Sequence, residues 1–164
     1  MHAHDEARVP GHGAKASGRR SGGDGDNVMQ SINVTMPIPP PEIRGNSRAH
    51  WAKKAGKFKA YKITAFYTLR EAMIKSGYSY KPVNKVEVHY QVFHCAKAID
   101  HDNFIIGMKA FVDCLASPKT DNDMAHGLIP DDSPDHFTIG SIKYIKVKHR
   151  TEARVEIEIT EVGA

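Results

Sequence analysis

The sequence predicts an α+β fold in which two helices pack against a small mixed β-sheet. Three observations predict it: apolar and polar residues alternate in four short segments, apolar residues recur at helical spacing in two longer segments, and the two patterns are interleaved along the chain. The length suits one folded domain, because the chain has 164 residues and a domain typically has ~100–200. We expect this domain at residues 31–164 and a disordered tail at residues 1–30, which are Gly-rich and nearly free of large apolar side chains.

The first strand and the first helix have clear sequence signals. Every second residue is apolar over residues 32–36, and Pro37 follows directly, so a strand is predicted there. A helix is predicted over residues 51–76, where lysines occupy the face opposite the apolar residues. Its apolar face comprises Phe58, Tyr61, Ala65, Phe66, Leu69 and Met73.

The remaining elements follow from the same two periodicities. Alternation predicts three more strands, at residues 84–94, 139–147 and 155–162. The last two are expected to pair as a hairpin that turns near residues 149–152. The apolar run at residues 104–116 predicts a mostly buried helix, and residues 117–130, rich in Asp, Asn, Pro and Gly, predict a loop.

Composition excludes several classes of protein. The hydrophobic fraction is 40% and the charged fraction is 26%, and no apolar run approaches the ~18 residues of a membrane span. No apolar segment follows the first charged residues, so we expect no secretory signal. Cys95 and Cys114 cannot form a disulfide framework, which favours a reducing, cytoplasmic setting.

Charge is distributed unevenly along the chain. Residues 42–85 carry eleven basic and two acidic side chains, whereas residues 86–164 carry eight basic and thirteen acidic ones. This asymmetry indicates that one part of the protein binds a polyanion and another part binds a cation. The structural alternative is a solvated helix face that is rich in lysine.

Two aspartates stand between a predicted strand and a predicted helix. Asp100 and Asp102 are two positions apart, and side chains at that spacing in extended chain point the same way, so both can face one cation. Carboxylate oxygens are the ligands that Mg²⁺ and Mn²⁺ prefer. An EF-hand loop is excluded, because that motif needs Gly where Ile105 stands. The structural alternative is that these aspartates cap the helix.

A second acidic pair follows the predicted loop. Asp131 or Asp132 could complete a three-carboxylate site if the loop folds back over the sheet; otherwise the pair forms a turn. The intervening helix carries Lys109, its one basic residue, which either reaches solvent or points at the acidic cluster. In a phosphodiester-cleaving site this lysine could stabilise the charge of the transition state. Asp113 lies one turn further on and offers a purely structural ion pair.

Three elements of the sequence, in this order, resemble the RusA family of Holliday junction resolvases. They are Asp100-His101-Asp102-Asn103, the helix segment KAFVDCL at residues 109–115, and GLIPDD at residues 127–132. The opening TMPIPPP and the closing RVEIEITE also look like that family, so the resemblance covers residues 31–162. One departure is the loop at residues 116–126, which looks longer than usual and carries additional aspartates.

The resemblance implies a homodimeric, Mg²⁺-dependent endonuclease, of a bacterium or a prophage, that nicks four-way DNA junctions in recombination and repair. Asp100, Asp102 and Asp132 would be the metal-binding carboxylates, with Mn²⁺ as a possible substitute for Mg²⁺. Lys109 would be the catalytic lysine. Asn103 would shape the turn and support the site by hydrogen bonding.

The basic block would then neutralise DNA phosphates, chiefly through Arg44, Arg48, Lys53, Lys54 and Lys57. Trp51 lies within this block, where it would either stack on an unpaired base or anchor the helix to the core.

Two other functions remain open at this stage. One is a catalytically inactive protein that binds branched or single-stranded DNA. The other is a zinc hydrolase or zinc-stabilised module, since zinc favours nitrogen and sulfur ligands. Its candidate ligands are His94, Cys95, His101, Cys114 and His126, which show no recognised spacing.

Overall fold

The computed structural model describes Met29 and residues 31–163. Apart from Met29, the disordered tail predicted at residues 1–30 lies outside the described residues. The backbone N–H of Met29 donates to the Glu161 carboxylate at 3.1 Å, so this residue adjoins the last strand.

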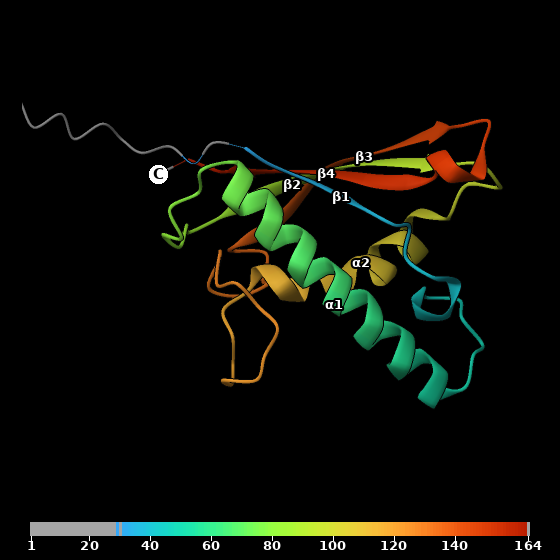
Figure 1. The fold of residues 1–164 in the computed structure, drawn as a ribbon, viewed down its shortest axis with the longest axis horizontal. Coiled ribbons are helices and arrows are strands. Elements are labelled where there is room, and N and C mark those ends of the chain that lie inside the picture. Colours follow the sequence, from blue (N-terminus) through green and yellow to red (C-terminus); the bar gives the residue numbers. More distant parts are fainter. Residues whose placement is uncertain (1–28, 30, 164) are drawn as a thin grey trace, which may run out of the picture.

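Four strands and two α-helices make up the described part of the chain, in an α+β arrangement that confirms the predicted fold class (Figure 1). The elements are β1 (Ile32–Met36), α1 (Trp51–Lys75), β2 (Val86–His94), α2 (His101–Leu115), β3 (Phe137–Lys146) and β4 (Arg154–Glu161), with short 3₁₀ helices η1 (Pro41–Ile43) and η2 (Arg150–Glu152).

The strands form one mixed sheet in the order β1-β4-β2-β3. β4 is antiparallel to both of its neighbours, and β2 and β3 are parallel, so β1, β2 and β3 all run in the same direction. The predicted hairpin of the last two strands is therefore wrong, because β2 lies between β3 and β4. Alternation identifies the buried face of a strand, but it does not say which other strand pairs with its backbone.

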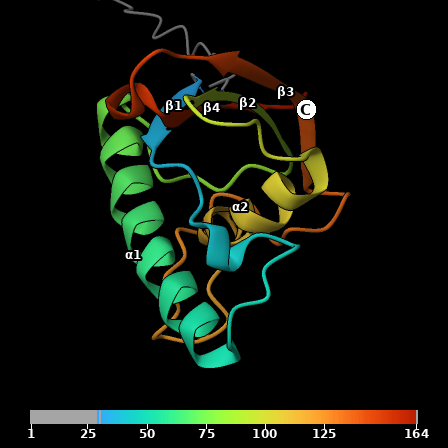
Figure 2. The same ribbon diagram turned by 90° about the vertical axis from the view of Figure 1, so that its right-hand side faces the viewer.

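Both helices pack on the same face of the sheet, as two roughly perpendicular views show (Figures 1 and 2). The core lies between the sheet and the two helices, and every second residue of β1, β2 and β4 contributes an apolar side chain to it. The Tyr90 ring of β2 contacts Phe104 of α2 edge-to-face, with ring centroids 5.4 Å apart. α1 contributes the buried stripe Tyr61, Ala65, Leu69, Ala72 and Met73. This stripe confirms the helical spacing that the sequence predicted.

α2 begins three residues earlier than its apolar pattern predicted. Asp100 is its N-cap residue, with extended backbone, and residues 101–103 form its first turn. These residues are polar and lie at the surface, so they carry no apolar periodicity from which a helix could be inferred. The difference places Asp102 inside the helix rather than in extended chain before it. The expectation that the Asp100 and Asp102 side chains point the same way is therefore wrong, because it depended on extended chain at both residues.

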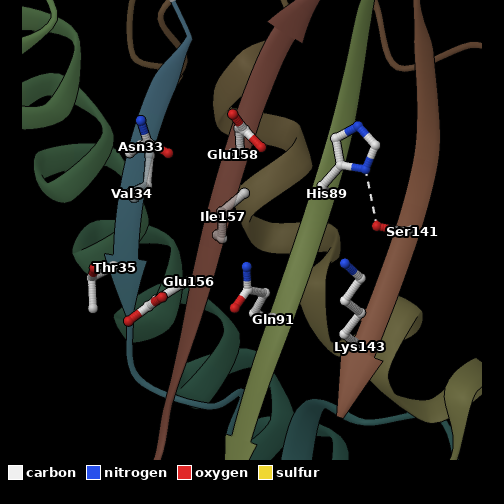
Figure 3. A pocket seen from close by; sticks show the side chains of 10 residues that line it. All are labelled: Asn33, Val34, Thr35, His89, Gln91, Ser141, Lys143, Glu156, Ile157 and Glu158. Carbon is white, nitrogen blue, oxygen red and sulfur yellow. Dashed lines mark hydrogen bonds between the residues drawn. The ribbon is translucent and has the colours of Figure 1, made fainter. Parts of the chain in front are cut away.

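The other face of the sheet is polar, and no helix of the described residues covers it (Figure 3). A cavity of about 390 Å³ lies over it. Within this cavity a hydrogen bond of 3.0 Å joins His89 Nδ1 and Ser141 Oγ (Figure 3). We call the end of the sheet at which β1, β2 and β3 finish the carboxyl edge. The predicted site residues lie at this edge and on the side of the sheet that the helices cover.

Candidate functional site

Asp100 follows β2 at the carboxyl edge and begins α2. An aspartate in this position usually accepts a hydrogen bond from the first turn, but the Asp100 carboxylate makes no such bond. One of its oxygens accepts instead from Asn103 Nδ2 at 3.4 Å. The carboxylate is exposed and is not needed to cap the helix, which makes it available to a ligand.

Asn103 connects α2 to the segment that precedes α1. Its side-chain oxygen accepts from the backbone N–H of Asn46 at 3.0 Å. Gly45 makes the approach possible, because a Cβ there would lie 2.6 Å from Ile106 Cδ1 and 2.8 Å from Asn103 Oδ1. The Asn103 side chain therefore connects the two segments by hydrogen bonding, while its support of a site, which the resemblance implies, stays a prediction.

Next to this contact, basic residues and Asp100 line one cavity. A cavity of about 510 Å³ lies between the 41–48 segment and the start of α2, and Arg44, Arg48, Asp100 and Asn103 are among the residues that line it. The Arg44 guanidinium is held by a bond from Nε to the carbonyl of Pro39 at 2.8 Å. Burial lowers the pKa of Arg44 from its ordinary value, so an anion that binds there would offset the cost of desolvating the charge.

The exposed face of α2 carries three charged residues in one row. Asp102, Lys109 and Asp113 are separated by seven and four residues, spacings that return to the same side of an α-helix. Seven residues correspond to about 10 Å along the helix axis. Asp102 therefore lies about two turns from Lys109.

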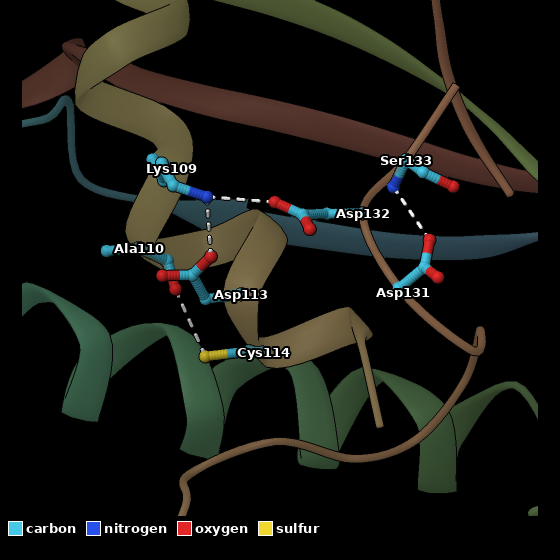
Figure 4. Close-up of polar contacts among 7 residues, drawn as sticks. All are labelled: Lys109, Ala110, Asp113, Cys114, Asp131, Asp132 and Ser133. Carbon is cyan, nitrogen blue, oxygen red and sulfur yellow. Dashed lines mark hydrogen bonds and ion pairs between the residues drawn. The ribbon is translucent and has the colours of Figure 1, made fainter. Parts of the chain in front are cut away.

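Lys109 binds two carboxylates at once (Figure 4). Its ammonium donates to Asp132 at 2.8 Å and to Asp113 at 3.0 Å. The hydrogen bond from Lys109 lowers the pKa of Asp132, and the same bond raises the pKa of Lys109, so each group stabilises the charged form of the other. Lys109 points at the second acidic pair, and it also makes the helix ion pair with Asp113.

The two members of the second acidic pair do different things. Asp131 accepts from the backbone N–H of Ser133 at 2.9 Å, and hydrogen bonds from Ser133 lower the pKa of Asp131 (Figure 4). This is a turn, the structural alternative for that residue. Asp132 is the member that reaches α2.

The structure brings Asp132 to the same helix face as Asp102, but it does not gather three carboxylates. Within residues 31–163, no group of three or more His, Cys, Asp or Glu side chains is arranged to hold a metal ion. The three-carboxylate site of Asp100, Asp102 and Asp132 therefore stays a prediction. The donor chemistry of Asp100 and Asp102 does fit Mg²⁺, which takes oxygen ligands and is typically held by one or two protein carboxylates together with water and phosphate.

The predicted DNA-binding residues lie in the segment before α1 and in its first two turns. Arg44 and Arg48 line the same cavity as Asp100, whereas Lys53 forms an ion pair with Glu42 at 3.2 Å. Lys54 and Lys57 follow on the helix. Trp51 is 74% exposed, so the core-anchoring interpretation of this residue is wrong and its indole is free to contact a ligand.

The long loop after α2 is anchored to α1 through His126. The imidazole stacks on Phe66 with ring centroids 4.2 Å apart, and its Nε2 donates to the Phe66 carbonyl at 2.8 Å. Burial lowers the pKa of His126. Asp123, one of the additional aspartates, accepts backbone hydrogen bonds from Lys119 and Thr120 and shapes the loop.

The candidate zinc ligands are engaged separately. His126 is stacked on α1, Cys114 is buried and donates to the Ala110 carbonyl at 3.2 Å, and His94 bonds the carbonyl of Ala96. The structure gives no support to a shared zinc site among them.

Sequence reasoning missed two basic residues at the carboxyl edge, Lys97 and Arg150. A second cavity, of about 740 Å³, is lined by both and also by Arg44. Lys97 and Arg150 stand in the acidic half of the chain, where Lys97 has no basic neighbour and Arg150 has Lys148 and Arg154 close by. Their positions after predicted strands, and the basic neighbours of Arg150, were the signals that could have found them.

Two comparisons with known proteins were negative. No protein-family model matches this chain, and no curated protein matches it. The resemblance to the RusA family rests on the residues quoted above. Among the described residues, no helix has the length and apolar character that crossing a membrane requires.

Proposed function

We propose that the protein is a Mg²⁺-dependent endonuclease that cuts branched DNA, in particular four-way junctions. The observation that carries this proposal is the juxtaposition of Asp100 with Arg44 and Arg48 around one cavity. Carboxylates suit a hard divalent ion, and guanidinium groups suit the phosphates of the same substrate. The order of motifs along the chain supports the same conclusion.

Asp100 and Asp102 would hold the metal, and Asp132 would join them. A divalent ion in such a site polarises the scissile phosphate and lowers the pKa of a bound water. Asn103 would orient the Asp100 carboxylate through its amide N–H, while its oxygen holds the Asn46 backbone. The resemblance to the RusA family implies that hydrolysis would leave a 5′-phosphate.

Lys109 would act as a positive charge beside the reacting phosphate. In the structure its ammonium is shared between Asp113 and Asp132. If Asp132 turns towards Asp102, Lys109 loses one partner and its charge becomes available to the substrate. Arg44, Arg48 and the lysines of α1 would hold flanking phosphates, so binding should weaken as salt is raised.

The proposed assembly is a homodimer of bacterial or prophage origin. A four-way junction has two-fold symmetry, and a two-fold dimer would present one active site to each of two opposing strands.

Cleavage of a synthetic four-way junction tests the function. With Mg²⁺, the wild-type protein should nick opposing strands, and Asp102→Asn should lower the rate by about 100-fold or more. Junction binding, measured in EDTA, should survive this substitution, because removing a carboxylate reduces repulsion from DNA. Asp121→Asn, the same change in the exposed loop, is the matched control and should cut at the wild-type rate. Equal cutting by the wild type and Asp102→Asn would contradict the metal site.

A second candidate function is supported by one observation. Asp132 is paired with Lys109 and is not grouped with Asp100 and Asp102. A protein that retained this pairing would bind branched or single-stranded DNA without cutting it. It would bind equally well with and without metal, and it would nick no junction with Mg²⁺ or Mn²⁺.

A further inference from the structure

A groove begins at Asp100 and extends from there along the carboxyl edge of the sheet. It consists of the two cavities of about 510 and 740 Å³, which lie next to each other, since Pro41, Arg44, Lys97 and Ile99 line both. We refer to both cavities together as the carboxyl-edge groove. Only its first cavity belongs to the candidate site described above.

Three segments from distant parts of the chain form the second cavity. Residues 37–41 follow β1, residues 94–99 comprise the last residue of β2 and those after it, and residues 150–153 follow β3. β1, β2 and β3 run in the same direction, so these three segments, which are far apart in the sequence, meet at one side of the sheet. This placement does not depend on the motifs that led to Asp100.

The chemistry of the groove suits a chain with phosphates on one side and apolar groups on the other. Each of the three segments or its continuation supplies one cation: Arg44, Lys97 and Arg150. Prolines of the 37–41 segment form an apolar wall, and the His94 ring lies among the lining residues. The acidic residues lie at the Asp100 end, where Glu42 is already neutralised by Lys53 at 3.2 Å.

The Pro wall is fixed against α2. A Cβ at Gly107 would lie 2.8 Å from Pro39 Cβ and 3.5 Å from Arg44 Cγ, so the glycine permits this close packing. Tyr61 also donates to the Pro37 carbonyl at 2.8 Å. Arg44 donates to Pro39, and its side chain is thereby held in the groove in advance of any ligand.

We propose that one unpaired nucleic-acid strand lies in the carboxyl-edge groove, with its phosphates on Arg44, Lys97 and Arg150 and its sugars or bases against the prolines. The proposal rests on the proposed function for the class of substrate, and it adds the path of the strand and two residues that bind it. Cavities of this size accommodate groups of drug-like dimensions, which suits nucleotides rather than a double helix. The strand would arrive at Asp100 already separated from its complement.

A cysteine in the groove provides a direct readout. Cys95 lines the larger cavity and is partly exposed, whereas Cys114, the other cysteine, is buried. A short oligodeoxythymidylate, added to the full-length protein in EDTA, should slow alkylation of Cys95 by a maleimide at least about fivefold, as expected for a site that the strand covers. A blunt duplex of the same length should not protect Cys95.

Binding of the same labelled oligodeoxythymidylate identifies the cations. Lys97→Ala/Arg150→Ala should weaken binding about tenfold and lower the slope of log affinity against log salt by about 1.4, since each contact with a single strand contributes about 0.7. Lys81→Ala/Lys85→Ala is the matched control, because it removes the same charge before β2, at the opposite edge of the sheet. It should leave both the affinity and the slope close to the wild type.

The outcomes separate this proposal from the nuclease. Three results would overturn the proposal that a strand lies in the groove, even if the protein cuts junctions. They are an alkylation rate of Cys95 that the oligonucleotide does not change, equal protection of Cys95 by the duplex, and an equal loss of binding affinity in both double variants. Protection of Cys95 with the expected loss in Lys97→Ala/Arg150→Ala would support the groove, even if no divalent ion elicits cutting. Protection of Cys95 by polyglutamate as strong as that by the oligonucleotide would also overturn it, because the groove would then accept any polyanion.

Discussion

The Lys109 ammonium on α2 donates to the Asp132 carboxylate at 2.8 Å, which ties the residues before β3 to the middle of the helix. Both side chains are substantially exposed, so the contact is screened by water. Because the hydrogen bond from Lys109 lowers the pKa of Asp132, the contact is coupled to pH.

Asp132→Asn should lower the free energy of unfolding by about 0.2–1 kcal/mol at neutral pH, the usual range for an exposed ion pair. The lowered pKa of Asp132 means that this contribution is present above the ordinary carboxyl pKa of 3.8 and is lost as the pH falls through the lowered value. Urea denaturation from about pH 7 to about pH 2 measures the difference between the two proteins. The difference should also shrink in about 1 M salt, and one that persisted in acid would rule out the ion pair as its source.

The two hydrogen bonds of the Asn103 side chain can be tested separately by substitution. Asn103→Ala loses both and should lower the free energy of unfolding by about 1 kcal/mol. Asn103→Asp keeps an acceptor for the Asn46 N–H, but it replaces the donor to Asp100 with a second carboxylate, which repels Asp100. Limited trypsin digestion after Arg44 and Arg48 should accelerate in the Ala variant and stay close to wild type in the Asp variant. Equal protection in all three proteins would mean that Asn103 does not hold this segment.

Two helical glycines should respond in opposite ways to the same substitution. Gly107→Ala places a methyl group 2.8 Å from Pro39 and should destabilise the protein by about 1–3 kcal/mol, because the Pro wall must move. A Cβ at Gly56 of α1 would meet nothing within 4 Å, so Gly56→Ala should stabilise by about 0.5–1 kcal/mol. Thermal unfolding measures both changes. A stabilised Gly107→Ala protein would show that α2 and the prolines are not in tight contact.

Removing the hydroxyl group should change the free energy of unfolding differently at two buried tyrosines. Tyr61 donates to the Pro37 carbonyl, so Tyr61→Phe should cost about 1 kcal/mol. The Tyr90 hydroxyl is buried without a hydrogen-bond partner among the described residues, so Tyr90→Phe should be neutral or should stabilise by about 1 kcal/mol. Guanidinium denaturation compares the two variants. A loss at Tyr90 as large as that at Tyr61 would reveal a hydrogen bond to the Tyr90 hydroxyl.

Local patterns in the sequence were sufficient for the elements themselves. The alternation of Ile32, Val34 and Met36 predicted β1, and the spacing of Tyr61, Ala65 and Leu69 predicted the buried face of α1. Periodicity works here because burial on one side of a strand or helix recurs with the period of the backbone. The start of α2 was misplaced because its first turn is polar on all sides.

The sequence alone determined that two aspartates stand together at the start of a helix and that a basic block precedes them. Only the tertiary structure decided that β4 pairs with β2, that Asp132 meets Lys109, and that Arg44, Lys97 and Arg150 line one groove. These relationships join residues far apart in the chain, and they depend on which elements bury one another. Periodicity reports the buried face of each element, but the partner on that face is chosen by the packing of the whole domain.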